Sequence, residues 1–431
     1  MTQPVSNSIA HASSRADGGK RPLSIAMLSP GWPRSKYANG IVTGVECLRL
    51  AFRDIGVPIQ VIAVEGRPEP GETDVHALPP PRPTSLFARP ARWVAWRTAP
   101  YQTHRLEMAD RIWRAIEPLI AAGKVDVLEM EESFGWASEV ARRAPIPVAV
   151  TLNGPWFLHG PLFDGANATE MQLRIEAEGE TLRNAFALIG PSRDVLQRSK
   201  QRYGLAARHE EVLPFPIGDH HGKGPWKLAG CDRNELLFVG RFDRHKGGDI
   251  AIDAFARVAA RNARARLVFV GPDRGVTDPE GRRWTLKDYI EARIPGALAS
   301  GRVVLTGQID PRALAERYRN ALATFTASRY ENFSLAAMES LAFGTPTIVA
   351  DQGGLPEHVL HGKTGLCFPA GNDAALAECM LELLDDPEYA ARLGAAAFTH
   401  IAREFNPTQL ARRRLAFFER VVEDFRSQRA S

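Results

Sequence analysis

The chain has 431 residues, 44% of them hydrophobic and 24% charged, with 54 Lys and Arg against 50 Asp and Glu. This length is more than one hydrophobic core usually organises, so we expect two domains of roughly 200 residues each. The composition excludes a disordered or fibrous chain, and a net charge of +4 is too small to indicate a nucleic-acid partner.

In the first half of the chain, short apolar runs alternate with helical patterns. The run 23–30 ends in Pro-Gly, a helical pattern follows from Gly40 to about Ile55, and a second apolar run covers 57–64. Further strands are expected at "VDVLEM", "IPVAVTL", "FALIGPS" and "EEVLP", with helices from about Ser133, from Ala168 to Asn184 and up to Tyr203. Regular alternation of this kind predicts a parallel sheet with helices on both faces.

Residues 214–234 are rich in Gly and Pro and lack periodicity, which predicts a linker between domains. The alternation restarts after it, with strands expected at "ELLFVG", "ARLVFVG", "RVVLTG", "ALATFTAS" and "TPTIVA". We therefore predict an α/β fold of two tandem, doubly wound Rossmann-like domains that face a cleft. The expected parts are a disordered tail (1–21), a first domain (22–213), the linker, a second domain (235–405) and a C-terminal helix (406–431) that packs back on the first domain.

An insertion in the first half interleaves arginines with aromatic residues. The side chains concerned are Arg89, Arg92, Arg97 and Arg105 with Phe87, Trp93, Trp96 and Tyr101. A basic aromatic segment is typical of a surface that lies on anionic lipid or binds a lipid-linked acceptor. The alternative is that the tryptophans cover the first domain. The sequence leaves both interpretations open.

The sequence favours a cytoplasmic protein. It has no run of eighteen apolar residues, so any membrane contact would be peripheral, at the inner face. Its four cysteines lie far apart without a C-x-x-C pair, which suits a reducing compartment better than a disulfide framework or a zinc site.

Charged side chains follow the first strand of the second half. In "FVGRFDRHKGGD", Arg241 comes directly after the strand and Lys246 stands at the head of the next helix. In open α/β sheets, ligands bind outside the carboxyl ends of the strands. Two cations beside the unpaired N–H groups of a helix start form a strong site for an anion. We therefore expect a phosphate-bearing ligand here.

Two further strand ends carry groups suited to a nucleotide. Gln308 and Ile309, after "LTG", could offer main-chain hydrogen bonds to a nucleobase edge. In "RYENFSLAAMES", residues 332–335 are expected to begin a helix whose free N–H groups bind phosphate oxygens. Metal ligation is not expected, because no D-x-D motif is present.

Two glutamates frame that helix start. Glu331 precedes it, and Glu339 lies about one turn inside it. Helical side chains lean toward the N-terminus, so Glu339 can reach back to a ligand held there. Carboxylates accept hydrogen bonds from hydroxyl groups, such as those of a ribose or a sugar. A single ligand made of a sugar, a diphosphate and a nucleoside would contact both cations, Arg241 and Lys246, and both glutamates.

The motifs "GRFDRHKGGD" and "YENFSLAAMESLAFGTPTIVADQGGLPEHVLHGKTGLCFPAGND" resemble the donor-binding half of a family-four retaining glycosyltransferase of the GT-B fold. Glu331 and Glu339 match the E-x7-E signature of that family, and Arg241 and Lys246 match its diphosphate-binding cations. The resemblance covers about 140 residues.

The resemblance implies a function for each matched residue. Arg241 and Lys246 would neutralise the departing nucleoside diphosphate, and Glu331 would contact the donor sugar. Glu339 would hold the ribose. The amides of Phe333, Ser334 and Leu335 would cradle the phosphates, and Gly40, in a glycine-rich loop of the first half, would approach the diphosphate closely.

The first half departs from the family pattern on the acceptor side. Where many relatives carry a histidine after the strand that ends near Thr151, this chain has Asn153 and Gly154, with His159 a few residues on. Asn153 and His159 are therefore the acceptor-side candidates. His159 is a candidate base, although a lone histidine is often structural.

The resemblance implies transfer of a sugar from a UDP-, GDP- or ADP-linked donor to a saccharide or lipid-linked hydroxyl, without a cofactor. It also implies retention and a place in polysaccharide, glycolipid or glycoconjugate biosynthesis. Three alternatives stay open: a non-catalytic nucleotide-sugar sensor or pathway scaffold, a phosphorylase and an epimerase. The E-x7-E match disfavours the epimerase, and no pyridoxal-binding lysine motif of a phosphorylase is identifiable.

Overall fold

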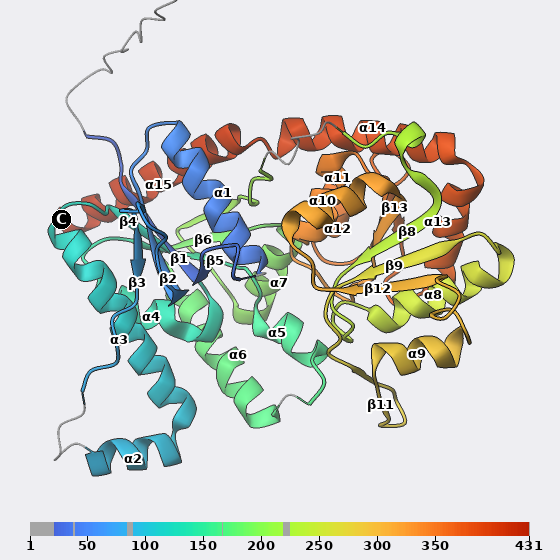
Figure 1. Ribbon diagram of the computed structural model, residues 1–431. Helices are drawn as coiled ribbons and strands as arrows, with labels where there is room; N and C mark the ends of the chain where they lie inside the picture. The colour runs from blue at the N-terminus through green and yellow to red at the C-terminus, as the bar shows by residue number, and fades with distance from the viewer. Residues whose placement is uncertain (1–20, 38, 84–88, 166, 219–224, 431) are drawn as a thin grey trace, which may run out of the picture.

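A computed structural model describes residues 21–37, 39–83, 89–165, 167–218 and 225–430. It contains two α/β domains side by side, each built on a parallel sheet (Figure 1). Of the predicted tail 1–21, only Arg21 lies within the described residues, where its guanidinium forms an ion pair with Asp126 at 2.8 Å.

The first sheet has seven strands among the described residues, in the order β3-β2-β1-β4-β5-β6-β7. Every pair of neighbours in it is parallel, as the alternation of strands and helices predicts. The elements are β1 (Ile25–Trp32), α1 (Gly40–Asp54), β2 (Ile59–Gly66), β3 (Val75–Ala77), α2 (Arg89–Thr98), α3 (Pro100–Ala121), β4 (Val127–Glu131), α4 (Trp136–Ala141), β5 (Val148–Thr151), α5 (Trp156–His159), α6 (Ala168–Arg183), β6 (Ala187–Gly190), α7 (Arg193–Tyr203) and β7 (His209–Val212).

Helices cover both faces of this sheet because its central strands are apolar on both sides. In β1, Ile25 and Met27 join the core that contains α1, whereas Ala26 and Leu28 join a separate core under α3 and α4. Alternate residues of a strand point to opposite faces, so one apolar run supplies both cores.

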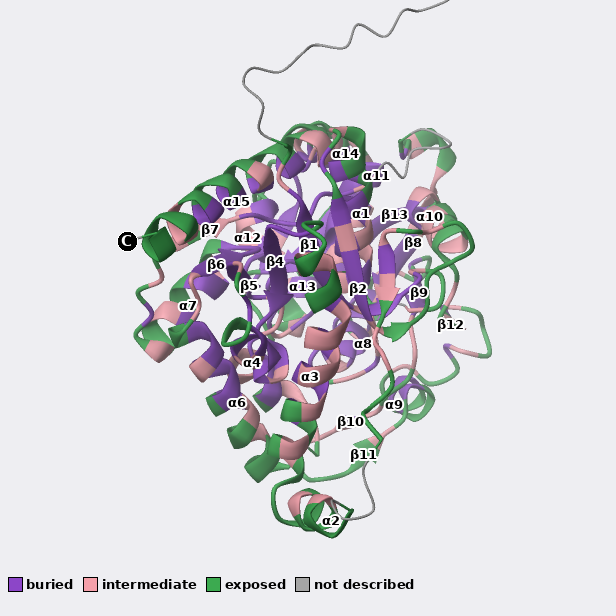
Figure 2. Ribbon diagram, turned by 90° about the vertical axis from the view of Figure 1, so that its left-hand side faces the viewer, coloured by how far each residue is buried: buried purple, intermediate pink, exposed green. Residues whose placement is uncertain are grey.

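The insertion forms α2 and the first turns of α3, two helices that the alternation pattern does not reveal. Its α3 half covers the first domain: Arg105 is buried and hydrogen-bonds to Ser138 at 2.7 Å. Its α2 half lies at the tip of the domain (Figure 2) and contains no buried residue. Trp93 in this helix is 62% exposed. The interpretation that the tryptophans cover the domain is therefore wrong, and Phe87 lies outside the described residues.

The second sheet has six strands among the described residues, in the order β12-β9-β8-β13-β14-β15. A two-stranded antiparallel hairpin projects beside it. The elements are β8 (Asp232–Val239), α8 (Gly248–Arg261), β9 (Arg266–Val270), β10 (Val276–Thr277), β11 (Arg283–Trp284), α9 (Leu286–Arg293), β12 (Val303–Gly307), α10 (Pro311–Asn320), β13 (Ala321–Thr326), α11 (Leu335–Phe343), β14 (Thr347–Ala350), α12 (Leu355–His358), β15 (Leu366–Phe368) and α13 (Asp373–Asp385).

The connection between the domains is shorter than the predicted linker 214–234. Strand β8 begins at Asp232, and the segment before it is anchored by Trp226, whose indole donates to the carbonyl of Ala321 at 2.8 Å. Part of the predicted linker, 219–224, lies outside the described residues. Strands are predicted from the spacing of apolar residues, and residues 232–234 are polar. The sequence pattern therefore does not reveal that β8 begins at Asp232.

The chain returns to the first domain through α14 (Pro387–Glu404) and α15 (Pro407–Ala430). Phe417 and Phe418 of α15 are buried in the same core as Leu48 and Phe52 of α1. That core also contains Phe333 beside the start of α11, so apolar packing continues from one domain into the other. Burial of this kind fixes the two domains beside each other, with the carboxyl ends of both sheets at the interface.

A buried ion pair ties α15 to the first sheet. Arg414 is 1% exposed and pairs with Glu129 of β4, and it also donates to the carbonyl of Leu213 at 2.7 Å. We expect Arg414→Ala to lower the free energy of unfolding by about 3 to 5 kcal/mol, because it leaves Glu129 buried without a counter-charge. Urea unfolding followed by circular dichroism measures this change.

The neighbouring Arg413, 54% exposed in its ion pair with Glu211, provides the control. Arg413→Ala should cost less than about 1 kcal/mol, because exposed pairs contribute little. Equal costs for the two variants would contradict the importance of the buried pair.

Candidate active site

A cavity of about 590 Å³ lies between the two domains, at the carboxyl ends of both sheets. Its wall contains most of the residues selected from the sequence. These are Gly40, Asn153 and His159 of the first domain and Arg241, Lys246, Gln308, Ile309, Glu331, Phe333, Ser334 and Leu335 of the second. Glu339 is the exception, because it is not among the residues that line this cavity.

Strand order explains why the cations meet Glu331. In the second sheet the chain runs from β8 outward through β9 to β12 and then crosses back to β13, on the other side of β8. The loops after β8 and β13 therefore leave the sheet in opposite directions and open a crevice between them, the usual ligand site of doubly wound sheets. Arg241 and Lys246 follow β8, and Glu331 follows β13.

An ion pair spans this crevice. The ammonium of Lys246 lies 2.5 Å from a carboxylate oxygen of Glu331, which also accepts from the hydroxyl of Ser328 at 2.8 Å. Asp243 holds the β8 loop from within, accepting from Arg241 Nε at 2.5 Å and from the amide of Lys246 at 2.7 Å. The two cations are thus fixed on one short loop that faces the acid.

Glu331 remains ionised although it is buried. Burial alone would raise its pKa, but Lys246, His245 and the hydroxyl of Ser328 lower the pKa to about 2. The charged form is stable only because these partners surround it. Lys246 is therefore already neutralised by Glu331, and a bound diphosphate would compete with Glu331 for it.

Glycines allow the loops of this crevice to pack closely. Gly247 has a φ of +66°, and a Cβ atom there would lie 1.9 Å from the carbonyl oxygen of Ala327 at the end of β13. Gly353 has the same φ, and a Cβ atom would lie 2.1 Å from the carbonyl oxygen of Glu331. Other residues would push the Lys246 and Glu331 loops out of place.

The start of α11 differs from the prediction. The helix begins at Leu335 rather than at Asn332, because Ser334 has a φ of +47°, which is outside helical geometry. Positive φ in a residue other than glycine is strained, and such strain concentrates at functional sites. The first amides of α11 lack intrahelical partners and stand at the cavity, in the wall formed by Phe333, Ser334 and Leu335.

Glu339 faces the first domain rather than the cavity. A carboxylate oxygen lies 3.7 Å from a guanidinium nitrogen of Arg34, in the loop after β1. Burial raises the pKa of Glu339 to about 7, and Arg34 and the hydroxyl of Tyr318 offset only part of this. Gly40 also touches the second domain here, since a Cβ atom at Gly40 would lie 3.2 Å from Leu335.

His159 joins a polar contact between the domains. Its Nδ1 lies 3.1 Å from Nε2 of His245, and its Nε2 lies 3.4 Å from the side-chain oxygen of Asn332. The amide of Asn332 donates to the carbonyl of Asn153 at 2.6 Å. Burial lowers the pKa of His159 to about 4 and that of His245 to about 3, so both rings are neutral near pH 7.

Two polar atoms of the cavity wall are left without a hydrogen bond to any described residue. They are the hydroxyl of Thr326 and the side-chain oxygen of Asn153. Buried polar atoms in native proteins are nearly always paired, so such atoms indicate a place for a polar ligand. The described ranges contain no group of three His, Cys, Asp or Glu side chains placed to hold a metal ion.

Two family models together match most of the chain. The model described as "Glycosyl transferase 4-like domain" matches residues 39–216, and the one described as "Glycosyl transferases group 1" matches residues 227–400. The chain belongs to the group 1 glycosyltransferases. The first match covers the first domain, and the second covers the domain that holds Arg241, Lys246 and Glu331.

Known proteins resemble this glycosyltransferase in sequence and in fold. Mannosylfructose-phosphate synthase of Agrobacterium fabrum is 28% identical over 226 residues, which are 50% of this chain and 49% of that protein. The match thus spans about half the length of that relative.

Among solved structures, sucrose-phosphate synthase from Thermosynechococcus elongatus superposes with a TM-score of 0.67 at 22% identity, over 93% of this chain and all of that one. HepE of Anabaena, in complex with UDP and glucose, gives a TM-score of 0.65 at 15% identity, over 92% and 99%. These likenesses show the GT-B fold.

Sequence reasoning missed several residues of the glycosyltransferase site. Asp243 lies inside the quoted motif, and its position between the two cations was the available signal. His245 lies in the same motif, but its contact with His159 of the first domain has no local signal. Arg34 gave no signal at all, because its partner Glu339 is about 300 residues away in the sequence. Only the packing of the two domains brings them together.

Acid should weaken the contact between the domains. Because the pKa of His159 and of His245 is lower in the folded protein than the usual 6.5, the unfolded chain binds more protons between about pH 6.5 and 4. The stability that these two neutral rings contribute should therefore be lost as the pH drops through this range. We expect His159→Gln to show a shallower decline of the melting temperature, measured by calorimetry from pH 7.5 to 4.5.

His361→Gln, at an exposed position, is the matched control and should keep the steep decline. Identical pH profiles for His159→Gln and the unmodified protein would exclude His159 as a source of the acid sensitivity.

Proposed function

We propose that this glycosyltransferase moves a sugar from a nucleoside-diphosphate sugar to an acceptor hydroxyl, with retention at the sugar carbon. One observation carries the proposal: Arg241, Lys246, Glu331 and the start of α11 all line a single cavity between the domains. Cations and free amides suit a diphosphate, and a buried, ionised carboxylate beside them suits sugar hydroxyls.

The charges define a mechanism. Breaking the sugar–phosphate bond leaves positive character on the sugar and additional negative charge on the diphosphate. Arg241, Lys246 and the α11 amides stand where they can stabilise the leaving diphosphate, and such preorganised groups often supply the largest catalytic contribution. As the donor binds, its phosphates would draw Lys246 from Glu331, which frees that carboxylate for the sugar. Metal would then not be needed.

The remaining wall residues suit the rest of the donor and the acceptor. Gln308 and Ile309 would face the base, and Gly40 would lie beside the diphosphate. Glu339 would reach a ribose only by exchanging its contact with Arg34. Asn153 and His159, from the first domain, would face the acceptor; a neutral His159 can accept a proton, although its low pKa makes it a weak base.

The relatives support a nucleotide-sugar donor. HepE binds UDP and glucose in its solved complex, which favours a UDP-linked donor for this chain too. Mannosylfructose-phosphate synthase and sucrose-phosphate synthase are named for the saccharide phosphates they make. We place this chain in polysaccharide, glycolipid or glycoconjugate biosynthesis, acting in the cytoplasm.

The decisive assay mixes the protein with UDP-, GDP- and ADP-sugars and a panel of acceptors, with and without excess chelator. We expect turnover with one base, unaffected by chelator, and stabilisation of the fold by about 2.7 kcal/mol at a hundred times the dissociation constant of its nucleotide. Lys246→Ala should reduce turnover at least about a hundredfold, because it removes one donor to the leaving group. Binding of the nucleotide without any hydrolysis or transfer would instead identify a sensor.

A second variant separates catalysis from folding. Lys246→Ala leaves Glu331 buried without its partner, so it will also destabilise the protein by a few kcal/mol. The double variant Lys246→Met with Glu331→Gln removes both charges and should recover most of that stability without recovering turnover. If turnover returns along with stability, Lys246 does not act on the leaving group.

We also propose that α2 attaches the enzyme to anionic membranes. No helix in the described parts of the chain is long and apolar enough to cross a bilayer. One face of α2 nevertheless presents Arg89, Arg92, Trp93 and Trp96, and the sequence contains no acidic residue between Val75 and Leu106. Exposed tryptophans among arginines suit the headgroup region of an anionic leaflet.

Sedimentation with vesicles tests this attachment. The protein should bind vesicles that contain phosphatidylglycerol and not vesicles of phosphatidylcholine alone, and Trp93→Ala with Trp96→Ala should abolish binding. The control is Val304→Ala with Leu360→Ala, which removes apolar side chains that are 38% and 39% exposed on the second domain. Equal vesicle binding by both double variants would refute an interaction through α2.

A further inference from the structure

A second cavity, of about 250 Å³, adjoins the first on the side of the β10–β11 hairpin. The loop 162–164 of the first domain forms one wall, and the loops 241–244 and 274–275 with Arg283 of β11 form the other. Arg241 and Arg274 line both cavities, so the two spaces are neighbours along one cleft.

Arginine dominates this second cavity. Four arginines (Arg241, Arg244, Arg274 and Arg283) stand against two aspartates (Asp164 and Asp243), an excess of two positive charges. The aspartates already have partners: Asp243 accepts from Arg241, and Asp164 accepts from the amide of Thr277 at 2.8 Å. Within the described residues, no carboxylate forms an ion pair with Arg244, Arg274 or Arg283.

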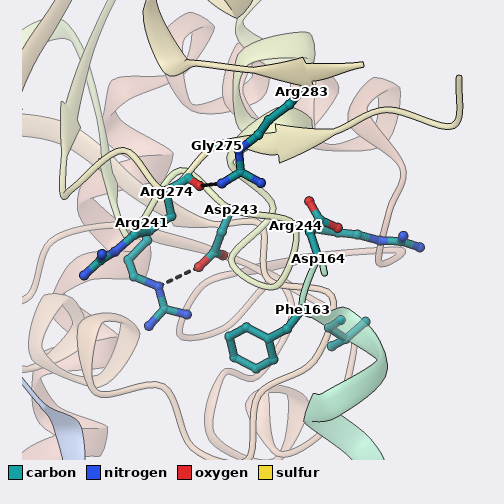
Figure 3. A pocket seen from close by; sticks show the side chains of 9 residues that line it. Phe163, Asp164, Arg241, Asp243, Arg244, Arg274, Gly275 and Arg283 are labelled. Atoms are coloured by element: carbon teal, nitrogen blue, oxygen red, sulfur yellow. Dashed lines mark hydrogen bonds and ion pairs between the residues drawn. The ribbon is translucent and has the colours of Figure 1, made fainter. Parts of the chain in front are cut away.

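The walls of this cavity are held in place. The guanidinium of Arg283 donates to the carbonyl of Arg274, and the bond from Thr277 to Asp164 ties the hairpin to the first domain. In Figure 3, Arg283 reaches down from the hairpin, Phe163 lies below it, and Arg241 lies at one side with its bond to Asp243. The guanidinium carbon of Arg241 lies 5.9 Å from the centre of the Phe163 ring.

We propose that this second cavity binds a phosphate group carried by the acceptor saccharide while the donor occupies the larger cavity. A phosphate monoester has a charge of about −1.5 to −2 near pH 7, which matches the excess of two positive charges. Guanidinium groups bind phosphate through paired hydrogen bonds. The loop 162–164 follows Asn153 and His159 in the first domain, so a phosphate here places the rest of the acceptor next to the donor sugar.

The proposal rests on the proposed function, because it takes the larger cavity as the donor site. The donor's own diphosphate is the other source of the same chemistry. Lys246 and the start of α11 line only the larger cavity, which assigns that diphosphate to the larger space.

Calorimetric titration of the UDP-saturated protein tests the second cavity. The probes are inorganic phosphate, glucose 6-phosphate and glucose. We expect the two phosphates to bind and glucose not to bind, and Arg283→Gln to weaken phosphate binding by at least about tenfold while leaving UDP binding unchanged. Arg282→Gln is the matched control, because the guanidinium of Arg282 lies over the Trp284 ring at 3.6 Å, away from the cavity.

Three outcomes would overturn the proposal: neither phosphate binds the UDP-saturated protein, UDP displaces the phosphate, or Arg283→Gln and Arg282→Gln bind it equally. Arg274→Gln gives a second route should Arg283→Gln fail to fold. If UDP does not bind at all but Arg283 still governs phosphate binding, the donor assignment fails and the anion site stands.

Discussion

The ion pair between Lys246 and Glu331 joins the two loops on which the site depends. It bridges the only place in the second sheet where neighbouring described strands, β8 and β13, send their loops in opposite directions. A lysine and a glutamate 85 residues apart can approach to 2.5 Å there because glycines let both loops pack tightly. Burial makes the pair sensitive, since either charge alone would be costly.

The second domain holds the charges, but the first domain closes the site. Arg34 reaches Glu339, His159 meets His245, and Asn332 donates to the carbonyl of Asn153. All of these contacts cross the cleft. Their alignment depends on the apolar core that runs from α1 and α15 to Phe333, so packing far from the cavity sets the geometry within it.

Positive charge extends along the whole cleft. In the larger cavity Lys246 pairs with Glu331, and Arg241 and Arg274 line both cavities, so each cavity has an excess of two positive charges. A ligand with a diphosphate at one end of the cleft and a second anion at the other would complement this distribution. Electrostatic complementarity of this kind increases the specificity of binding and the association rate more than it increases the binding affinity.

The sequence by itself determined the fold class and most of the residues of the second domain that line the larger cavity. Alternating apolar runs and helical patterns identify two parallel sheets, because a strand covered on both faces must be apolar throughout. Arg241, Lys246 and Glu331 stand directly after strands, and chain order alone brings such residues to the edge of the sheet where ligands bind. Local signals therefore sufficed for these residues.

Tertiary structure decided the rest. The first residue of α11 depended on the backbone of Ser334, and the inward or outward position of Glu339 depended on Arg34, more than 300 residues earlier. The exposure of Trp93, the partners of His159 and the set of arginines that lines the second cavity depend in the same way on segments distant in sequence. Periodicity reports which face of an element is apolar, but contacts between domains are fixed only when both domains pack, so no local pattern encodes them.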